Sequence, residues 1–210
     1  MPKNILITAG PTWVALDGVR VISNIATAQT GFLLAKEAKK RGYQATLALG
    51  PAQQPFVCRN IIIKPFRYFD ELLHLIKKEA GSKKYDIIIH TAAVSDYQPA
   101  GTTRKKIKSG IKNLILRLKP TLKIVNYIKK LDRKIFLVMF KLETEISDEI
   151  LINRAKDALI KAKADLIVAN KTEPRYKAFI MDGNRIYARL NSKREMSEKL
   201  FDVIARKRAG

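Results

Sequence analysis

Cysteine, glycine and proline are all scarce in this sequence. Its 210 residues include one cysteine, Cys58, with 10 glycines and 8 prolines. One cysteine excludes an internal disulfide and any metal site made from several cysteines, and it is compatible with a reducing cytoplasm. With 47% hydrophobic residues and few chain breakers, the sequence predicts one domain, residues 1–210, with a sizeable buried core.

Long apolar runs are absent as well. None approaches the roughly 20 residues that a membrane-spanning helix needs. The N-terminus passes from Met1 and Pro2 almost directly into apolar residues, without the separate basic and apolar regions of a signal peptide. We therefore expect a cytoplasmic protein with no membrane partner.

Acidic residues are few relative to basic ones. Lys and Arg number 41 against 19 Asp and Glu, which gives a formal net charge of +22. An excess of this size is found in proteins that bind nucleic acid. Such binding requires cations that are concentrated in one region, with aromatic side chains between them. The cations are instead spread over most of the expected helices, and the one dense tract, residues 104–119, lacks aromatics. Nucleic acid is therefore not favoured, because anionic small substrates explain the tract equally well.

Apolar segments of strand length alternate with segments of helical periodicity. This pattern is typical of an α/β fold, here a Rossmann-like, doubly wound, mostly parallel sheet flanked by helices. Residues 114–118 are among the strands expected in the parallel set. Near the C-terminus, residues 178–181 and 186–190 flank an Asp-Gly-Asn turn. The sequence therefore predicts a C-terminal β-hairpin, followed by a helix from Ser192.

Small residues follow two of the expected strands. Gly10 comes after the first strand, and Ala92 and Ala93 come after the strand at residues 86–90. Ligands of an open parallel sheet bind beyond these carboxyl ends, where backbone amides and helix N-termini favour anions. Asp96 follows shortly after as an acid that could hold a metal or a hydroxyl group.

A long loop, about residues 97–113, follows this strand. Loops of this length in compact domains are usually functional or disordered. Its cations Lys106 and Lys108 could close over a phosphate and neutralise the charge that develops during transfer of a phosphoryl or nucleotidyl group. We interpret the loop as a lid, with a solvated charge run as the alternative.

Two other kinds of site are not indicated. The G-x-G-x-x-G fingerprint of nicotinamide dehydrogenases is missing, and Gly50-Pro51 stands where such an enzyme would carry an acid. His74 and His90 have no third ligand at metal-site spacing, so both are interpreted as structural, and no residue is assigned as a metal ligand.

Six segments together resemble the phosphopantothenate-cysteine ligase family, in its standalone form. The segments, in the order that the family has them, are Gly10-Pro11-Thr12, Val19-Arg20 with Ser23-Asn24, Ala92-Ala93-Val94-Ser95-Asp96, Lys106-Ile107-Lys108, Phe140-Lys141-Leu142-Glu143-Thr144 and Asp165-Leu166-Ile167-Val168-Ala169-Asn170. The match extends from the first strand to Asn170. One stretch departs from the family pattern of two serines, a glycine and a basic residue, because this chain has residues 25–30 as Ile-Ala-Thr-Ala-Gln-Thr.

The resemblance implies a two-step ligation. The carboxylate of 4'-phosphopantothenate would attack the α-phosphate of ATP or CTP, and the amine of L-cysteine would then displace the nucleoside monophosphate, with Mg²⁺ shielding the triphosphate. It also implies a homodimer in which one subunit helps to cover the other's site. The implied catalytic residues are Lys106 and Asn24; the nucleotide site has Gly10, Ala92, Ala93, Asp96, Lys106, Lys108 and Phe140; the substrate site has Asn24, Ala26, Ala28, Gly31, Phe140 and Asn170.

Two alternatives remain open. The fold could belong to a nucleotide-binding or nucleic-acid-binding protein that has lost this reaction, or to a relative that uses a different acid substrate.

Overall fold

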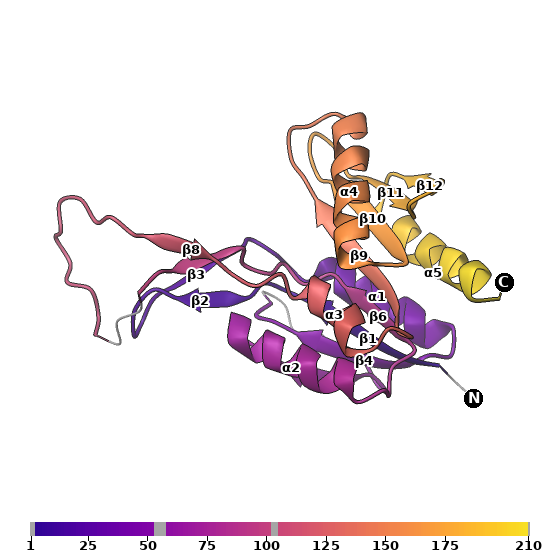
Figure 1. Cartoon of the computed structure of the whole chain (residues 1–210), viewed down its shortest axis with the longest axis horizontal. Coiled ribbons are helices and arrows are strands. Elements are labelled where there is room, and N and C mark those ends of the chain that lie inside the picture. Colours follow the sequence, from indigo (N-terminus) through magenta and orange to yellow (C-terminus); the bar gives the residue numbers. More distant parts are fainter. Residues whose placement is uncertain (1–2, 53–57, 102–104, 210) are drawn as a thin grey trace.

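A computed structural model describes residues 3–52, 58–101 and 105–209 of the chain. The centre of the molecule is an eight-stranded sheet with the order β12-β11-β10-β9-β6-β1-β4-β5 (Figure 1). Its strands are β1 (Asn4–Ala9), β4 (Gln44–Leu49), β5 (Ile62–Pro65), β6 (Ile87–His90), β9 (Phe136–Leu142), β10 (Leu166–Lys171), β11 (Lys177–Met181) and β12 (Ile186–Leu190). Neighbouring strands are parallel from β10 to β5, and β11 and β12 are added antiparallel. The predicted Rossmann-like sheet and C-terminal hairpin are confirmed.

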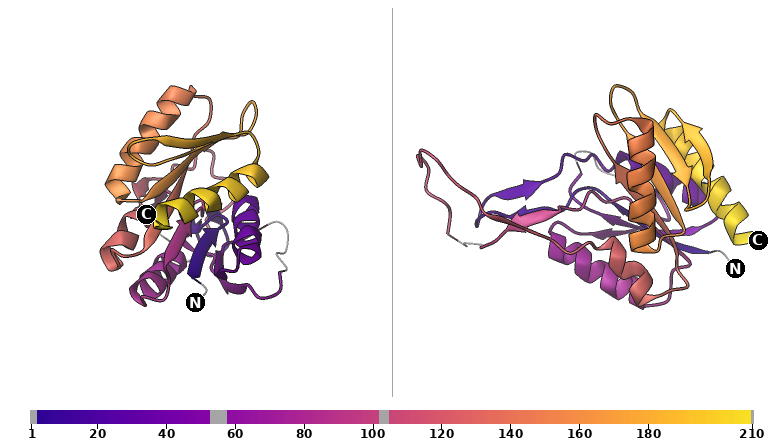
Figure 2. Two further views of the ribbon diagram at one scale, coloured as in Figure 1. Left: turned by 90° about the vertical axis from the view of Figure 1, so that its right-hand side faces the viewer. Right: turned by 45° about the horizontal axis from the view of Figure 1, so that its top comes forward.

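Helices cover both faces of the sheet (Figure 2). The helices are α1 (Gln29–Lys40), α2 (Phe69–Gly81), α3 (Val125–Leu131), α4 (Asp148–Ala162) and α5 (Lys193–Ala209). Successive side chains of a strand point to opposite faces, so β1 contributes to two cores. Ile5 and Ile7 pack in the core beneath α1 and α5, whereas Leu6 packs in the core beneath α2, α3 and α4. The doubly wound arrangement follows from this burial on both faces.

Local sequence signals set several helix ends. Ser147 precedes α4, and its hydroxyl oxygen accepts a hydrogen bond from the Ile150 amide at 3.2 Å, which satisfies one of the free N–H groups of the first turn. Gly42 lies just after α1 with φ of +80°, a conformation that costs glycine nothing. These local signals help to set where α1 ends and where α4 begins.

An arm projects from the carboxyl edge of the sheet, on the side opposite the two termini (Figure 1). It consists of two antiparallel ribbons, one formed by β2 (Trp13–Ala15) and β3 (Val21–Ser23), the other by β7 (Tyr97–Pro99) and β8 (Leu118–Pro120). The predicted lid loop lies in this arm; its residues 97–99 form β7 instead of loop, and the rest lies between β7 and β8. Residues 102–104 of that loop, including the first cation of the dense basic tract, lie outside the described residues.

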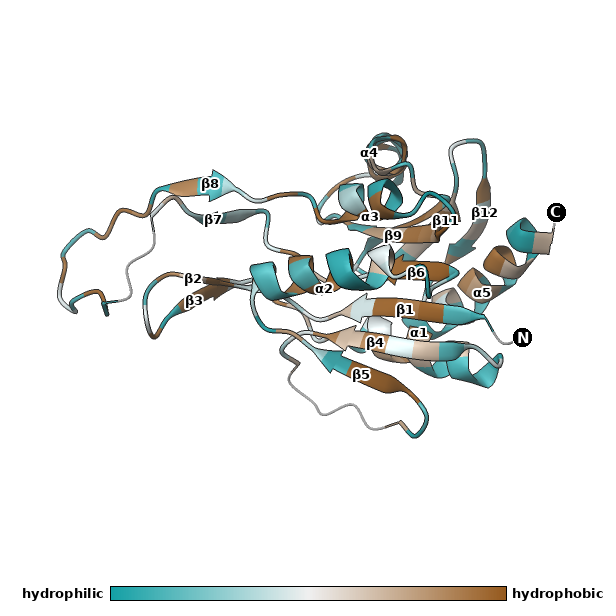
Figure 3. Cartoon of the chain, turned by 60° about the horizontal axis from the view of Figure 1, so that its bottom comes forward, coloured by the Kyte–Doolittle hydropathy of each residue, from teal (hydrophilic) through white to brown (hydrophobic). Residues whose placement is uncertain are grey.

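The prediction of a strand at residues 114–118 in the parallel sheet is wrong. Only Leu118 of that segment is in a strand, and β8 pairs with β7 in the arm instead of joining the parallel sheet. The apolar pattern of the segment is real, but Ile115 is 84% exposed, so its apolar side chains are not buried by the rest of this chain. Hydropathy colouring shows brown and teal alternating along this loop, whereas brown runs along the buried strands β1 and β6 (Figure 3).

Within the described parts of the chain, no helix is both long enough and apolar enough to span a membrane.

Candidate functional site

The strand order reverses beside β1. The chain adds β4 and β5 on one side of β1 and then crosses to add β6 on the other side. Ligands of open α/β sheets bind outside the carboxyl ends of the strands at such a switch point. A ligand site is therefore expected at the loops that follow β1 and β6.

These two loops are joined by backbone hydrogen bonds. The Ala93 amide donates to the carbonyl oxygen of Gly10 at 2.9 Å, and the Thr12 amide donates to the carbonyl oxygen of Ala93 at 3.2 Å. The pairing brings together Gly10, Ala92 and Ala93, three residues predicted for the nucleotide site. No side chain beyond a methyl group stands at these positions, so a ligand could approach the backbone closely.

Gly10 also has a packing reason to be glycine. Its φ is +84°, and an added Cβ would lie 3.1 Å from the backbone of Gly50 in the loop after β4. A Cβ on Gly50 would in turn lie 2.4 Å from the carbonyl oxygen of Pro11. The loops after β1 and β4 therefore cross at a distance that only glycine permits, whatever ligand binds here.

Asn24 anchors the base of the arm to the switch point. Its Nδ2 donates to the carbonyl oxygens of Ala93 and Val94, both at 3.1 Å. With its N–H groups engaged in this way, the amide offers a ligand chiefly its carbonyl oxygen. The structure thus brings Asn24 together with Gly10 and the alanines, as the predicted site requires.

Two residues that sequence reasoning missed lock the same loops together. The amide of Ser95 donates to Thr12 Oγ1 at 2.9 Å, and the Ser95 hydroxyl donates to the carbonyl oxygen of Thr12 at 3.1 Å. Both side chains are buried, so these bonds are shielded from water. Thr12 and Ser95 belong to segments that carried the family resemblance, but neither was assigned a role.

His90 ends β6 directly beneath these loops. Its Nδ1 lies 3.0 Å from the hydroxyl oxygen of Thr8, which also accepts from the Ala92 amide at 3.2 Å. Burial lowers the pKa of His90 to about 4, because an imidazolium would lose its hydration there. A neutral histidine therefore supports the loop, in agreement with the structural role predicted for it.

Asp96 lies on the surface at the edge of this group. Its Oδ1 is 2.6 Å from Lys123 Nζ, and both side chains are more than half exposed. An exposed ion pair of this kind contributes little to stability. The carboxylate is thus accessible to a ligand that can replace Lys123.

The start of α1 contains three of the predicted substrate residues. Ala28 is the N-cap with φ of 62°, and it provides no side-chain hydrogen bond to the helix. Gly31 is buried against β1, where an added Cβ would lie 2.2 Å from the Cβ of Ala9. Ala26 is half-buried in the preceding loop. The close contact at Gly31 gives α1 its tight packing on β1, a role that does not depend on substrate.

Phe140 and Asn170 lie further along the carboxyl edge. Phe140 pairs with Val168 in the ladder between β9 and β10, and Asn170 pairs with Leu142. Phe140 is half-buried and packs on the α1 and α5 side of the sheet. These residues are on the same edge as Gly10, but separate strands carry them.

Lys106 and Lys108 are exposed on the arm and flank Ile107, which is tethered. The Ile107 amide donates to Asp17 Oδ2 at 3.0 Å, and Arg20 Nη1 donates to the Ile107 carbonyl oxygen at 3.1 Å. Asp17 lies in the turn between β2 and β3, and hydrogen bonds from the backbone amides of Ile107, Val19 and Arg20, with that from Ile107 the largest, lower the pKa of its carboxyl group. The turn dipeptide Asp17-Gly18 was the available sequence signal for this tether.

The tether separates the lid lysines from the rest of the predicted site. Asn24 lies at the base of the ribbon formed by β2 and β3, and Asp17 lies at its tip. A strand of three residues spans about 10 Å. The structure therefore groups Gly10, Asn24, Ala92 and Ala93, and it places Lys106 and Lys108 at a distance on the arm.

Comparisons with known proteins agree with this architecture. The family model described as the DNA/pantothenate metabolism flavoprotein C-terminal domain matches residues 1–207. The chain is 37% identical over 211 residues to the coenzyme A biosynthesis bifunctional protein CoaBC of Thermococcus kodakarensis, which covers 96% of this chain and 51% of that protein. The chain spans about half the length of the curated relatives that it matches.

Solved structures share the fold. The DNA/pantothenate metabolism flavoprotein of Streptococcus pneumoniae superposes with a TM-score of 0.88 at 27% identity, covering 98% of this chain and 99% of that one. A Cab2 mutant in complex with phosphopantothenate-cysteine superposes with a TM-score of 0.83 at 19% identity, covering 97% and 86%. Because the family model matches almost the whole sequence, the chain belongs to the family of the DNA/pantothenate metabolism flavoprotein C-terminal domain.

Proposed function

We propose that this chain joins 4'-phosphopantothenate to L-cysteine in coenzyme A biosynthesis. The family match and the name of the CoaBC relatives support this assignment. The observation that carries it is the junction of Asn24 with the paired loops after β1 and β6. This junction places three elements of the family motif at one switch point, where an activated anion would bind.

The reaction has two steps. In the first, a carboxylate oxygen of 4'-phosphopantothenate attacks the α-phosphate of ATP or CTP, and the bond to pyrophosphate breaks. In the second, the amine of cysteine attacks the acyl carbon, the nucleoside monophosphate leaves, and the amine loses a proton. The Cab2 mutant structure is a complex with phosphopantothenate-cysteine, which corresponds to the product of the second step.

Asn24 would position the acyl group during both steps. Its N–H groups are held by two main-chain carbonyls, so the orientation of the amide is fixed before substrate arrives. Its carbonyl oxygen is then directed to accept from an N–H or O–H group of the substrate or from the attacking amine. Fixed dipoles of this kind lower a barrier because they need no reorganisation during reaction.

Lys106 would supply positive charge to the crowded α-phosphate, with Lys108 as a second phosphate contact. Charge accumulates on this phosphate as the carboxylate attacks, and a cation held in place stabilises it. The tether at Ile107 supports this role, because it fixes the backbone between the two lysines while both side chains stay exposed.

Mg²⁺ would accompany the triphosphate and neutralise part of its charge. Among the described residues, no three His, Cys, Asp or Glu side chains gather as a metal site. Magnesium bound to nucleotides usually needs only one or two carboxylates in addition to phosphates and water. Asp96, exposed beside the switch-point loops, fits that need.

A homodimer completes the proposal. The arm exposes large apolar side chains, among them Val19, Tyr97, Ile115 and Leu118. Exposed apolar side chains on one projecting element favour an interaction site, and a second copy of the arm would be a self-complementary partner. A cytoplasmic location remains a prediction.

Pyrophosphate release tests the function directly. The protein is incubated with Mg²⁺, 4'-phosphopantothenate, cysteine and either ATP or CTP, and release is compared in Lys106→Ala, Asn24→Ala and the control Lys112→Ala, which removes another exposed lysine of the same loop. We expect release that requires phosphopantothenate and falls about 100-fold or more in the first two variants. Folded protein that releases no pyrophosphate with either nucleotide would refute the ligase assignment, and equal loss in Lys112→Ala would refute the specific role of Lys106.

A further inference from the structure

At the edge of the sheet opposite the candidate site lie loops and helix ends from many parts of the chain. Parallel strands begin at one edge, so the helices that connect them must end there. Both termini also lie at this edge, which faces the viewer in the left view of Figure 2. We call it the amino edge, and define it by residues 3, 39–44, 58–64, 82–86, 129–135, 161–165, 182–185 and 205–209.

The exposed charges of the amino edge are positive. Exposed cations there are Lys3, Lys40, Arg41, Arg59, Lys83, Lys84, Lys130, Arg133, Lys134, Lys161, Lys163, Arg185 and Arg206. The acids in the same segments are buried or half-buried, and they have internal partners. Asp86 accepts from the Asn4 amide and contacts Arg208, and Asp165 accepts from the Leu137 amide. Cations that are spread along the sequence are therefore concentrated in space.

Helix electrostatics explain only part of this concentration. Cations in the last turn of a helix are stabilised by its dipole, which accounts for residues such as Lys40 and Lys130. The dipole does not account for Lys3 before β1, Arg59 before β5 or Arg185 in the hairpin turn, since none of these lies in a helix. The cations of these loops need another explanation.

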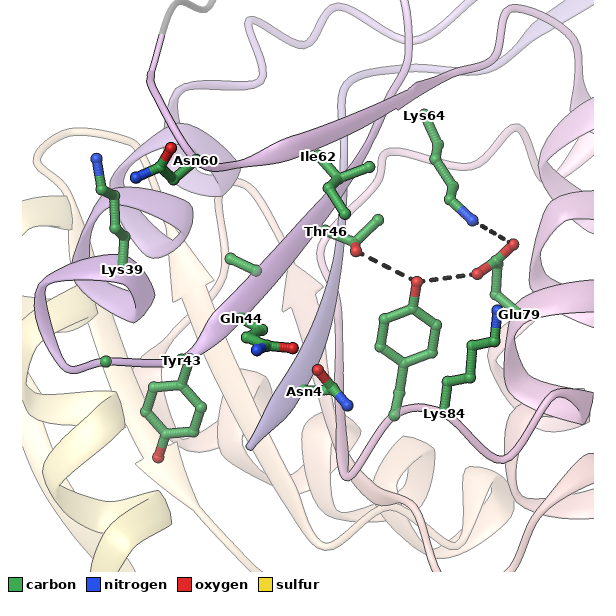
Figure 4. A pocket seen from close by; sticks show the side chains of 13 residues that line it. Asn4, Lys39, Tyr43, Gln44, Thr46, Asn60, Ile62, Lys64, Glu79 and Lys84 are labelled. Carbon is green, nitrogen blue, oxygen red and sulfur yellow. Dashed lines mark hydrogen bonds and ion pairs between the residues drawn. The ribbon is translucent and has the colours of Figure 1, made fainter. Parts of the chain in front are cut away.

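A pocket opens within the amino edge. It has a volume of about 640 Å³, and its lining includes Lys39, Lys64 and Lys84 (Figure 4). Glu79 is occupied, since Lys64 Nζ donates to it at 2.5 Å and the Tyr85 hydroxyl donates to it at 2.9 Å. The side chains of Lys39 and Lys84 lie on opposite sides of the pocket in Figure 4. The recess thus adds the half-buried Lys39 to the exposed cations already named and shares Lys84 with them.

The size of the amino edge matches one turn of a nucleic-acid duplex. Eight strands about 4.8 Å apart span about 34 Å, and one turn of B-form DNA rises about 34 Å. Aromatic platforms for unstacked bases are lacking in the described segments of this edge. Tyr43 packs against Phe201, and Tyr187 is covered by Arg185. We infer that the amino edge binds the phosphate backbone of duplex nucleic acid, without reading its sequence.

Salt dependence is the first test. Binding of a fluorescent DNA duplex of about 20 base pairs is measured by anisotropy at about 50 and 200 mM NaCl. Neutralising about five phosphates predicts a slope near −4.5 in log affinity against log salt, which is a loss of about 500-fold over this range. Absence of binding at the lower salt concentration, or binding that salt leaves unchanged, would overturn the inference.

Two triple variants with the same change in net charge test the location. The first carries Arg59→Glu, Lys84→Glu and Arg133→Glu at the amino edge. The matched control carries Arg67→Glu and Arg175→Glu in connections at the carboxyl edge and Arg194→Glu in the first turn of α5 at the same edge, all of them exposed. We expect about 100-fold weaker binding in the first and less than about threefold in the second, because phosphate contacts act over short distances. Equal losses of affinity in the two triple variants would show that only the net charge of the protein determines binding, which would contradict the inference.

Folding and alternative partners are checked in the same series. If the Glu triple fails to fold, Gln at the same three positions removes the cations without adding acids, and it should still weaken binding at least about tenfold. Unaltered binding by this folded Gln triple would contradict the inference. Anionic lipid vesicles are tested in parallel, and binding to vesicles but not to duplex would assign the surface to membranes instead.

Discussion

Ala28 holds a backbone conformation that is costly for alanine. Its φ of 62° lies in the left-handed region, where the Cβ of an L-residue approaches the following carbonyl oxygen. The residue stands at the start of α1, in the one stretch where the sequence departs from the family pattern. A glycine at this position would adopt the same conformation without the steric cost.

We therefore expect Ala28→Gly to stabilise the fold. Removing the left-handed penalty of about 1–2 kcal/mol, less the greater chain entropy of unfolded glycine, leaves a gain of about 0.5–1 kcal/mol in the free energy of unfolding. Urea denaturation measures it. Ala26→Gly is the control, because Ala26 is not among the residues with positive φ, and it should lower the stability slightly. A loss of stability in Ala28→Gly would contradict this explanation.

His90 makes stability depend on pH. It is buried beside Thr8, and its pKa is lowered from 6.5 to about 4 by the loss of hydration. Below pH 6.5 the unfolded chain binds a proton that the native protein does not bind. The free energy of unfolding must therefore fall as the pH decreases from about 6.5 towards 4.

The expected loss from this residue between pH 7 and pH 5 is about 2 kcal/mol. Urea denaturation at the two pH values should show that His90→Gln reduces the difference by this amount, since glutamine does not titrate. His74→Gln removes an exposed histidine on α2 and should leave the difference unchanged. The same pH dependence in the wild type and in His90→Gln would exclude His90 as its source.

Sequence reasoning at the residue scale found the groups that carry recognisable motifs. Asn24, Gly10 and Ala93 do lie together, because the carboxyl ends of parallel strands meet at one edge. The contact between Thr12 and Ser95 could not be predicted, since it joins residues 83 positions apart and depends on the register of β1 against β6. Periodicity gives the identity of a strand but not the register of its neighbours.

At the scale of elements, the arm shows a second limit of prediction from sequence. Its residues 114–118 have the apolar pattern of a strand, and the pattern was assigned to the parallel sheet. Burial decides the outcome, and this segment stays exposed because the sheet is already flanked by other elements. The ribbon of β2 and β3 was missed for a related reason, since strands of three residues are too short for periodicity to detect.

The tether at Asp17 ties the two ribbons of the arm to each other. One carboxylate oxygen accepts from the amides of Val19 and Arg20, and the other accepts from the Ile107 amide. A side chain with two acceptor oxygens is required, because one oxygen accepts from the backbone amides of the β2–β3 turn and the other accepts from the Ile107 amide and from Arg20 Nη1. Asparagine has a single acceptor oxygen and cannot satisfy both.

Asp17→Asn should therefore release the lid while the domain stays folded. Losing the hydrogen bond that the Ile107 amide donates to this carboxylate predicts amide exchange at Ile107 faster by about tenfold, and pyrophosphate release lowered by a similar factor if the lid lysines act as proposed. Hydrogen exchange followed by mass spectrometry measures the first effect. Asp70→Asn, an exposed acid at the start of α2, is the control. Unchanged exchange at Ile107 would show that the tether does not hold the lid.

At the scale of the whole molecule, the two edges of the sheet differ in the residues that they carry. The carboxyl edge carries the candidate site and the arm, and the amino edge carries the concentrated cations. The net charge of +22 gave no indication of this division, since composition does not say where helices end. Only the order of the strands, which sends α1 to α4 back to the amino edge, turns scattered cations into one surface.

The arm also raises the question of which subunit's lid serves which site. Asn24 is at the base of the arm and the Ile107 tether is at its tip, about 10 Å away along the ribbon. If Lys106 and Asn24 act on the same acyl phosphate, we expect the lid of the partner subunit in the proposed homodimer to supply the lysine. Lys106→Ala and Asn24→Ala are each expected to be inactive alone. Activity should then return when their subunits exchange and form mixed dimers.

The expected recovery follows from counting sites in a two-fold dimer. Random exchange makes half of the dimers mixed, and each mixed dimer has one site with both changes and one with neither, so about a quarter of the wild-type activity should return. Pyrophosphate release is measured after the two variants are mixed, partly denatured and refolded together, with each variant treated alone as the control. If the lid serves its own subunit, every site in a mixed dimer keeps one defect and no activity returns. Because neither substitution changes the strands of the arm, this difference depends only on which chain provides the lid.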